Sequence, residues 1–273
     1  MKHQFISQKE CLITELISEN IIGILKQHIK HLLRKGEIKL NDEKIKTDVL
    51  IKKGDKISIF IPKSFLSNAN DLINSIKIVY EDENILLCYK PKGMDCENNL
   101  VSIITSKYKH ALLNHRLDRQ TDGLVIFTLN KPAYDSIYLA LKNQTIEKFY
   151  NATVKGKFNS NGTHTAYLTK NTTASFVKIS LNQTPNSKKI ISHFEFKKQK
   201  SDSLCMIEAK PISGRTHQLR AHLAFLGHPI LGDTKYGTCK NPPLHLTAYK
   251  ITFTKLPAPL EYLNGQTIKI TPN

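Results

Sequence analysis

Short runs of strand-forming residues dominate the chain from Ile76 onward, and this pattern most constrains the fold. Turn-forming Gly, Pro, Asn and Asp residues separate the runs. Helical segments are rarer there, and the clearest begins at Lys131, where Pro132 suits a first helical turn. Because few helices alternate with the strands, we predict an α+β domain with a mixed, largely antiparallel sheet. The runs are IKIVY, NILLCYK, GLVIFTL, YNATVKGK, SHFEFKK, SLCMIEAKPI and ITFTKL.

The N-terminal part has a different organisation. Apolar residues over 11–35 recur at helical spacing with a break near Asn20–Gly23, which predicts two helices ending at Gly36. Short alternating segments with a turn at Asn41–Asp42 then predict a small hairpin layer.

In the last of these segments, Ile57, Ile59 and Ile61 share one face of a predicted strand. The polar, Ser- and Asn-rich stretch that follows is typical of a linker. We therefore predict a small domain over 1–62, a linker over 63–75 and a larger domain over 76–273.

Charge restricts the partners that the chain can have. It carries 40 Lys and Arg against 23 Asp and Glu, a formal net charge of +17. Such a surplus favours a polyanion such as RNA, although a lysine-rich surface can also serve solubility alone. No stretch approaches the roughly 18 apolar residues of a membrane span, and the N-terminus lacks a secretory pattern. We expect a cytoplasmic protein without membrane contact.

The five cysteines are scattered and contain no CxxC pair, so we predict free thiols and no zinc ribbon. The arginines are more informative, because only five of the 40 basic residues are Arg. Four of them fall in two short segments, HRLDR and GRTHQLR. Arg presents a planar fork that Lys cannot imitate, so the two segments indicate sites of geometric recognition.

In the first segment, Asp118 lies between Arg116 and Arg119. Nearby positive charge should keep this carboxylate ionised, a state suited to nucleophilic or electrostatic catalysis. A purely structural network of Asp and Arg would use the same residues. Gly123 follows, and we expect it to act as a flexible point before a buried strand.

The second segment predicts a helix that starts at Ser213 or Thr216 and runs to about Leu226. Its start would offer hydroxyl groups, backbone N–H donors and arginine forks to a phosphate or carboxylate. In such a helix Thr216 shares a face with Arg220, as Gln218 does with His222. Three histidines also lie in this region, but neighbouring members lack the spacing that brings helical side chains together, so we predict no metal site.

The third segment, Glu147 to Gly156, predicts an alternating strand that carries Tyr150. Considered alone, Tyr150 would be a core aromatic. Together, the three segments resemble the RluA-type pseudouridine synthase family. The resemblance covers residues 76–254; Gln120 and Asp122 depart from it, since the family has mostly Asp and Ser there. It rests on HRLDRQTDGLVIF, KFYNATVKG, SGRTHQLRAHLAFLGHPILGD and IVYEDENILLCYKPKGM.

The resemblance implies isomerisation of uridine to pseudouridine in RNA without a cofactor. Asp118 would be the nucleophile, attacking either the anomeric carbon or carbon 6. Tyr150 would stack on the flipped base, and Arg220 would pair with Asp118. Arg116 would occupy the space that the flipped base leaves, and base flipping costs a few kcal/mol.

The remaining predicted contacts are to RNA. Arg119, Arg215 and His217 are expected to bind RNA near the reaction. The stretch HLLRKGEIKLNDEKIKTDVLIKKGDKISIFIP resembles the S4-like RNA-binding domain. That resemblance implies a second RNA contact through Lys30, Arg34 and Lys35.

We expect a monomer that acts on a structured RNA. Large-subunit ribosomal RNA is the expected target, and transfer RNA is the alternative. A non-catalytic RNA-binding ribosome assembly factor would share the same surface, but it would not need Asp118, Tyr150 and Arg220 together. A metal-dependent RNA hydrolase would need clustered carboxylates and His ligands, and Glu81–Glu83 is the only acidic cluster.

Overall fold

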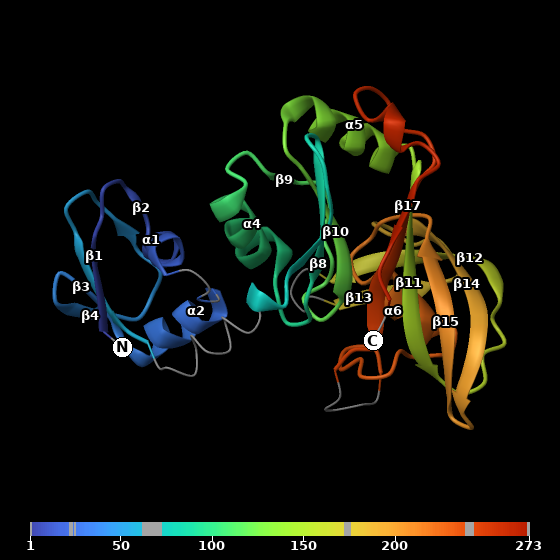
Figure 1. The fold of residues 1–273 in the computed structure, drawn as a ribbon. Coiled ribbons are helices and arrows are strands. Elements are labelled where there is room, and N and C mark those ends of the chain that lie inside the picture. Colours follow the sequence, from blue (N-terminus) through green and yellow to red (C-terminus); the bar gives the residue numbers. More distant parts are fainter. Residues whose placement is uncertain are drawn as a thin grey trace. The chain divides into compact units, whose positions relative to one another are not determined.

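The chain forms two compact units, shown in the computed structural model of Figure 1. Residues 1–77 and 94–111 form the first unit, and residues 78–93 and 112–273 form the second. The predicted linker lies almost entirely outside the described residues, so the predicted domain boundaries stay a prediction. The structure describes residues 2–21, 24, 26–61, 73–171, 176–237 and 243–271.

The first unit contains a four-stranded antiparallel sheet of order β1-β6-β3-β4, with α1 and α2 contributing to the same apolar core. Asn41 and Asp42 join β3 to β4 with φ of 48° and 69°, the left-handed geometry of a two-residue hairpin turn. The elements are β1 (Lys2–Ile6), β2 (Cys11–Leu12), α1 (Ile13–Asn20), α2 (Lys26–Lys35), β3 (Ile38–Leu40), β4 (Glu43–Ile45), β5 (Leu50–Ile51), β6 (Lys56–Phe60), the π-helical η1 (Cys96–Leu100) and α4 (Val101–Lys107).

The sequence pattern anticipated much of this unit. The two predicted helices are present, and Ile57, Ile59 and Ile61 are all buried in the core. Strand β1 was not anticipated. It pairs along its whole length with β6, but its sequence KHQFI lacks the alternation of apolar and polar residues that predicts a half-buried strand.

The second unit is built on an 11-stranded mixed sheet of order β13-β12-β14-β15-β11-β16-β10-β8-β7, with β17 beside β16 and β9 beside β10. All its strand pairs except β10–β16 are antiparallel, which confirms the predicted fold class. The elements are β7 (Lys77–Glu81), β8 (Ile85–Lys90), β9 (Leu112–Leu113), β10 (Asp122–Thr128), α5 (Lys131–Lys142), β11 (Ile146–Lys155), β12 (Gly162–Asn171), β13 (Phe176–Ser180), β14 (Lys188–Ser201), β15 (Leu204–Pro211), α6 (Gln218–Phe225), β16 (Leu246–Phe253), the 3₁₀ turn η2 (Glu261–Leu263) and β17 (Thr267–Lys269).

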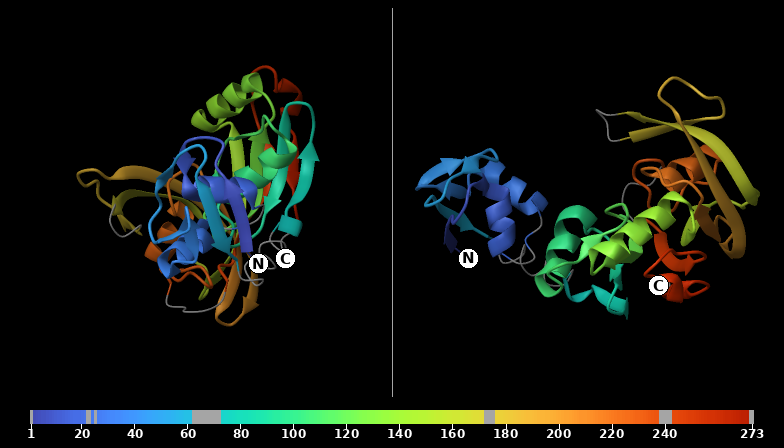
Figure 2. Two further views of the ribbon diagram at one scale, coloured as in Figure 1. Left: turned by 90° about the vertical axis from the view of Figure 1, so that its left-hand side faces the viewer. Right: turned by 90° about the horizontal axis from the view of Figure 1, so that it is seen from above.

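Helices α5 and α6 cover different parts of this sheet, as the views in Figure 2 show. Asn130 caps α5 by accepting a hydrogen bond from the Ala133 N–H at 2.9 Å. Ile137 of α5 packs in a core cluster with side chains of β8, β10 and β16. Ala221 of α6 packs with side chains of β12, β13 and β14. The sheet thus holds the two helices at fixed places along its length.

Helix α6 starts later than the sequence indicated. His217 adopts a left-handed conformation with φ of 53°, so the helix begins at Gln218 rather than at Ser213 or Thr216. Thr216 therefore shares no helical face with Arg220. Gln218 and His222 do lie one turn apart, and both bond the Ser192 hydroxyl, at 3.0 and 3.1 Å.

Gly123 lies where two strands approach very closely. It is paired with Ala248 on β16, which is paired in turn with Tyr150 on β11. A Cβ on Gly123 would lie 2.2 Å from the Ala248 carbonyl oxygen, and its φ is +123°. The expectation of a flexible point is thus wrong: the residue is glycine because the neighbouring backbone leaves no room for a side chain.

We predict that Gly123→Ala lowers the free energy of unfolding by about 2 kcal/mol or more, since it adds both a clash and backbone strain. Gly156→Ala is the matched control, because Gly156 has φ of +82° but nothing within 4 Å of its added Cβ. That change should cost only about 1 kcal/mol. Urea denaturation measures both, and equal losses would contradict the close-approach argument.

Candidate active site

The predicted catalytic residues come from three separate segments of the second unit. Asp118 lies in the loop before β10, Tyr150 lies on β11, and Arg220 lies in the first turn of α6. The loop also has a defined conformation, since the Thr121 N–H donates to the Asp118 carbonyl at 3.0 Å. Three segments far apart in the sequence therefore have to be positioned by the sheet and by α6.

Asp118 and Arg220 are in direct contact. Nη1 of Arg220 donates to Oδ2 of Asp118 at 3.1 Å, and the Asp118 side chain remains 22% exposed whereas that of Arg220 is buried. The structure thus contains the pairing that the sequence resemblance implies. It leaves one carboxylate held by a cation and still accessible to a molecule in solution.

The other side of the Arg220 guanidinium is held by Asp233, which was not predicted. Nε and Nη2 each donate to one oxygen of this carboxylate at 2.8 Å, so the pair is bidentate. The Asp233 side chain is fully buried, and it also accepts the backbone N–H of Lys235 at 2.9 Å and of Tyr236 at 3.0 Å. The only sequence signal was its place at the end of the GHPILGD segment.

These contacts fix the charge of both partners. Burial alone would lower the pKa of Arg220, but the carboxylates of Asp233 and Asp118 outweigh it and raise that pKa. Burial alone would raise the pKa of Asp233, but Arg220 and the two backbone N–H groups lower it below its ordinary value. Arg220 therefore stays positive and Asp233 stays negative over the ordinary pH range.

His217 lies beside this pair. Its Nε2 is 3.8 Å from Oδ2 of Asp118, and its Nδ1 is 2.9 Å from the Tyr236 hydroxyl, which also accepts the Val177 N–H at 3.0 Å. Burial lowers the pKa of His217, with Arg220 adding to the effect, and together they outweigh the attraction of Asp118. His217 is therefore neutral at neutral pH.

Tyr150 is positioned by the register of the sheet. It is buried on β11, and the register of β11 with β16 shifts between Phe149 and Tyr150, as at a β-bulge. The extra residue is Tyr249 of β16, so β11 itself keeps its regular alternation through Tyr150. Tyr150 is separated from Gly123 by the single strand β16, so their Cα atoms are about 10 Å apart.

The loop that carries Asp118 is attached to the turn after β8. The Arg119 side chain donates through Nε to the Gly93 carbonyl at 2.8 Å, and the Gly93 N–H donates to the Arg119 carbonyl at 2.8 Å. Buried Lys90 donates to the same Arg119 carbonyl at 3.4 Å. Arg119 thus has a structural role in the loop, and its contact with RNA stays a prediction.

Asp122 anchors the other end of the loop. Its carboxylate accepts hydrogen bonds from the hydroxyls of Tyr89 and Thr247, each at 2.8 Å, and lies 3.8 Å from Nζ of Lys92. Tyr89 belongs to β8 and Thr247 to β16, so one buried carboxylate joins both neighbours of β10. The resemblance predicts Ser at this position. The Asp side chain that is present instead makes these contacts.

The other predicted residues are exposed. Arg116 and Arg215 are exposed in the second unit, and Lys30, Arg34 and Lys35 are exposed on α2 of the first. Among the described residues there is no group of three or more His, Cys, Asp or Glu that could hold a metal ion. No helix within the described ranges is long and apolar enough to cross a membrane.

The chain is similar to a family of known proteins. A sequence model described as RNA pseudouridylate synthase matches residues 84–225, which include Asp118, Tyr150 and Arg220. The chain belongs to this family. It is therefore an isomerase that converts uridine to pseudouridine in RNA.

Two sequence relatives and one solved structure illustrate the family. The ribosomal large subunit pseudouridine synthase C of Vibrio parahaemolyticus is 30% identical over 247 residues, which span 82% of this chain and 76% of that protein. An uncharacterized RNA pseudouridine synthase of Mycoplasma genitalium is 32% identical, with 82% and 80% covered. The human RNA pseudouridylate synthase domain containing 1 structure has a TM-score of 0.59 at 26% identity, covering 74% of this chain and 91% of that one.

We predict that Asp233→Asn lowers kcat by about tenfold or more, because the neutral amide no longer fixes the guanidinium that positions Asp118. Release of tritium from carbon-5-labelled uridine measures the rate, and the loss should lie in kcat rather than in KM. Asp135→Asn is the control, since Asp135 is exposed and pairs with Lys131 on α5. An unchanged kcat in a folded Asp233→Asn protein would contradict the positioning role.

Proposed function

We propose that this pseudouridine synthase acts on large-subunit ribosomal RNA and that Asp118, Tyr150 and Arg220 carry out the reaction. The accessible Asp118 carboxylate, held by the Arg220–Asp233 pair, carries the assignment of the site. The target is supported by relatives from Vibrio parahaemolyticus, Vibrio cholerae and Vibrio vulnificus, all named ribosomal large subunit pseudouridine synthase C. The net charge of +17 suits a large RNA.

In this proposal Asp118 is the nucleophile. It attacks the target uridine at the anomeric carbon or at carbon 6, and the bond between N1 and the anomeric carbon breaks. The base then rotates and carbon 5 bonds to the anomeric carbon. The bond between Asp118 and the substrate breaks, which returns the free carboxylate, while the carbon-5 proton leaves and N1 gains a proton. Product and substrate have the same atoms, so the reaction needs neither an oxidant nor a nucleotide as an energy source.

The ion pairs around Asp118 suit a carboxylate that loses its charge during the reaction. Before attack, Arg220 is shared between Asp118 and Asp233. When Asp118 becomes covalently bound it is no longer an anion, but Arg220 is still balanced by Asp233. The buried cation is therefore paired at every stage, which avoids the large cost of leaving a buried charge alone.

Tyr150 and Arg116 would handle the base and the RNA duplex. Tyr150 offers an aromatic face to the flipped uracil, and its hydroxyl is a candidate acceptor for the carbon-5 proton. Exposed Arg116 would fill the space that the flipped base leaves in the RNA stack. Exposed Arg119 and Arg215 would contact phosphate groups near the target, with His217 beside Asp118.

The first unit would supply a second RNA contact as an S4-like domain. Lys30, Arg34 and Lys35 are exposed on α2, with Lys30 and Arg34 one helical turn apart. A row of cations on one helix suits the spacing of phosphates. This contact would add affinity without touching the reacting base.

The first test is release of tritium from carbon-5-labelled uridine in unmodified large-subunit ribosomal RNA. We expect release by the wild-type protein and none by Asp118→Asn, which keeps the shape and removes the nucleophile, while RNA affinity changes little. Release from transfer RNA but not from ribosomal RNA would contradict the target. Binding without release from either RNA would favour a non-catalytic assembly factor, and wild-type rates in Asp118→Asn would contradict the mechanism.

The triple change Lys30→Ala, Arg34→Ala and Lys35→Ala tests the second contact. It should weaken binding of the same RNA and reduce the slope of log affinity against log salt by about 2 to 3, since each lost phosphate contact contributes roughly 0.7 to 0.9. The kcat at saturating RNA should stay close to the wild-type value. An unchanged affinity and salt slope would show that α2 does not contact RNA.

A further inference from the structure

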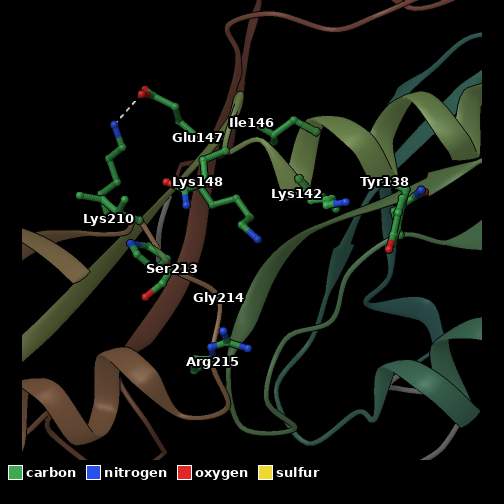
Figure 3. Close-up of a pocket in the computed structure, with 14 residues that line it drawn as sticks. Tyr138, Lys142, Ile146, Glu147, Lys148, Lys210, Ser213, Gly214 and Arg215 are labelled. Atoms are coloured by element: carbon green, nitrogen blue, oxygen red, sulfur yellow. Dashed lines mark hydrogen bonds and ion pairs between the residues drawn. The ribbon is translucent and has the colours of Figure 1, made fainter. Parts of the chain in front are cut away.

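A cleft of about 830 Å³ lies in the second unit, outside the group formed by Asp118, Arg220 and Asp233. The C-terminal half of α5, the start of β11 and the end of β15 with the segment after it form its walls (Figure 3). Its volume is within the range of small-molecule sites. Of the residues given a role so far, Arg215, expected to contact phosphate near the target, lines this cleft.

Positive charge converges on this cleft. Lys142, Lys148 and Arg215 line it, and Figure 3 shows Lys148 and Arg215 pointing into the same space. Among the described lining residues Glu147 is the only carboxylate, and it pairs with Lys210 at 2.5 Å. That pair points away from the other cations in Figure 3, so their charge is not neutralised. An anion is the ligand that such a cleft accommodates.

Lys148 is the least exposed of these cations. Burial lowers its pKa, and burial together with the Lys148 charge lowers the pKa of neighbouring His115 to about 3. The Lys148 side chain is half-buried, and the attraction between an ammonium group and a phosphate is stronger where less water surrounds them. Because Lys148 and Arg215 point into the same space, a phosphate beside Lys148 would contact more than one cation.

An aromatic ring lies on the opposite wall. Tyr138 on α5 lines the cleft with 59% of its surface exposed, although a ring of this size is usually buried. Its hydroxyl end is directed toward the cleft in Figure 3. An exposed ring beside several cations is the combination by which proteins bind unpaired nucleotides, with the base on the ring and the phosphate on the cations.

The cleft is also close to the reaction centre. Lys148 and Tyr150 are two residues apart on β11. Their side chains therefore leave the same face of the strand, with Cα atoms about 7 Å apart. On the opposite wall, Arg215 is two residues from His217, which lies beside Asp118. A strand with its target uridine at Asp118 would therefore have a neighbouring nucleotide at the cleft.

We propose that this cleft binds an unpaired nucleotide next to the target uridine, with its base stacked on Tyr138 and its phosphate at Lys148, Lys142 and Arg215. The inference rests on the proposed function in that the ligand is part of the RNA substrate. A nucleotide inside a duplex has both faces of its base stacked, so the site selects RNA that is single-stranded beside the target.

The first test measures the Kd of fluorescein-labelled hexauridylate. Tyr138→Ala should weaken binding about tenfold, Tyr138→Phe should bind like the wild type, and Leu139→Ala should not change the Kd, since stacking needs only the ring. Leu139 is the matched control because it is the next residue of α5, is 43% exposed and does not line the cleft. Equal affinities of Tyr138→Ala and Leu139→Ala would overturn the stacking role.

The salt dependence of the same binding tests the phosphate contact. Lys148→Met should reduce the slope of log affinity against log salt by about 0.7, the contribution of one phosphate of a single strand. Tyr138→Ala should leave that slope unchanged, because a stacking residue releases no counterion. An unchanged slope in a folded Lys148→Met protein, checked by its melting temperature, would overturn the phosphate assignment.

The two levels of proposal can fail separately. If the wild type fails to release tritium from ribosomal RNA but the hexauridylate results stand, the target is wrong and the cleft is supported. If the wild type releases tritium and Tyr138→Ala has wild-type affinity and wild-type KM, the enzyme proposal stands and the cleft proposal is overturned.

Discussion

The site depends on one guanidinium shared between two carboxylates. Arg220 holds buried Asp233 with two hydrogen bonds and accessible Asp118 with a third. Removing Asp233 would leave Arg220 with only its single hydrogen bond to Asp118 among these contacts, and removing Arg220 would leave a buried carboxylate without this counter-charge. The rest of the second unit keeps these groups in place: α6 carries Arg220, and the loop before β10 carries Asp118.

The sheet gives the reaction centre and the neighbouring cleft a common framework. Strand β11 carries Tyr150 and Lys148 two residues apart, so one element connects the proposed catalytic site to the proposed nucleotide site. The close approach of Gly123 to Ala248 fixes β10 against β16 at the end of the Asp118 loop. Backbone geometry thus sets the spacing of side chains that belong to distant parts of the sequence.

The sequence predicted the fold class, most strands of the second unit and the pairing of Asp118 with Arg220. It did not predict the late start of α6, because the left-handed conformation of His217 depends on contacts that periodicity does not record. It missed Asp233, because the contact of Asp233 with Arg220 depends on tertiary structure: Ile230, three residues earlier, pairs with Val154 of β11. It also treated Gly123 as a hinge, since a sequence does not show how close Ala248 lies.

The anchoring of Asp122 has a consequence for which uridines can react. The Asp118 loop is held at Asp122 to β8 and β16 and at Arg119 to Gly93, so the enzyme has little freedom left to lose there when RNA arrives. The conformational adjustment must come from the nucleic acid. The free energy of unstacking is lowest for a uridine that is already loosely stacked. The stiffness of this loop therefore makes the dynamics of the RNA part of substrate selection.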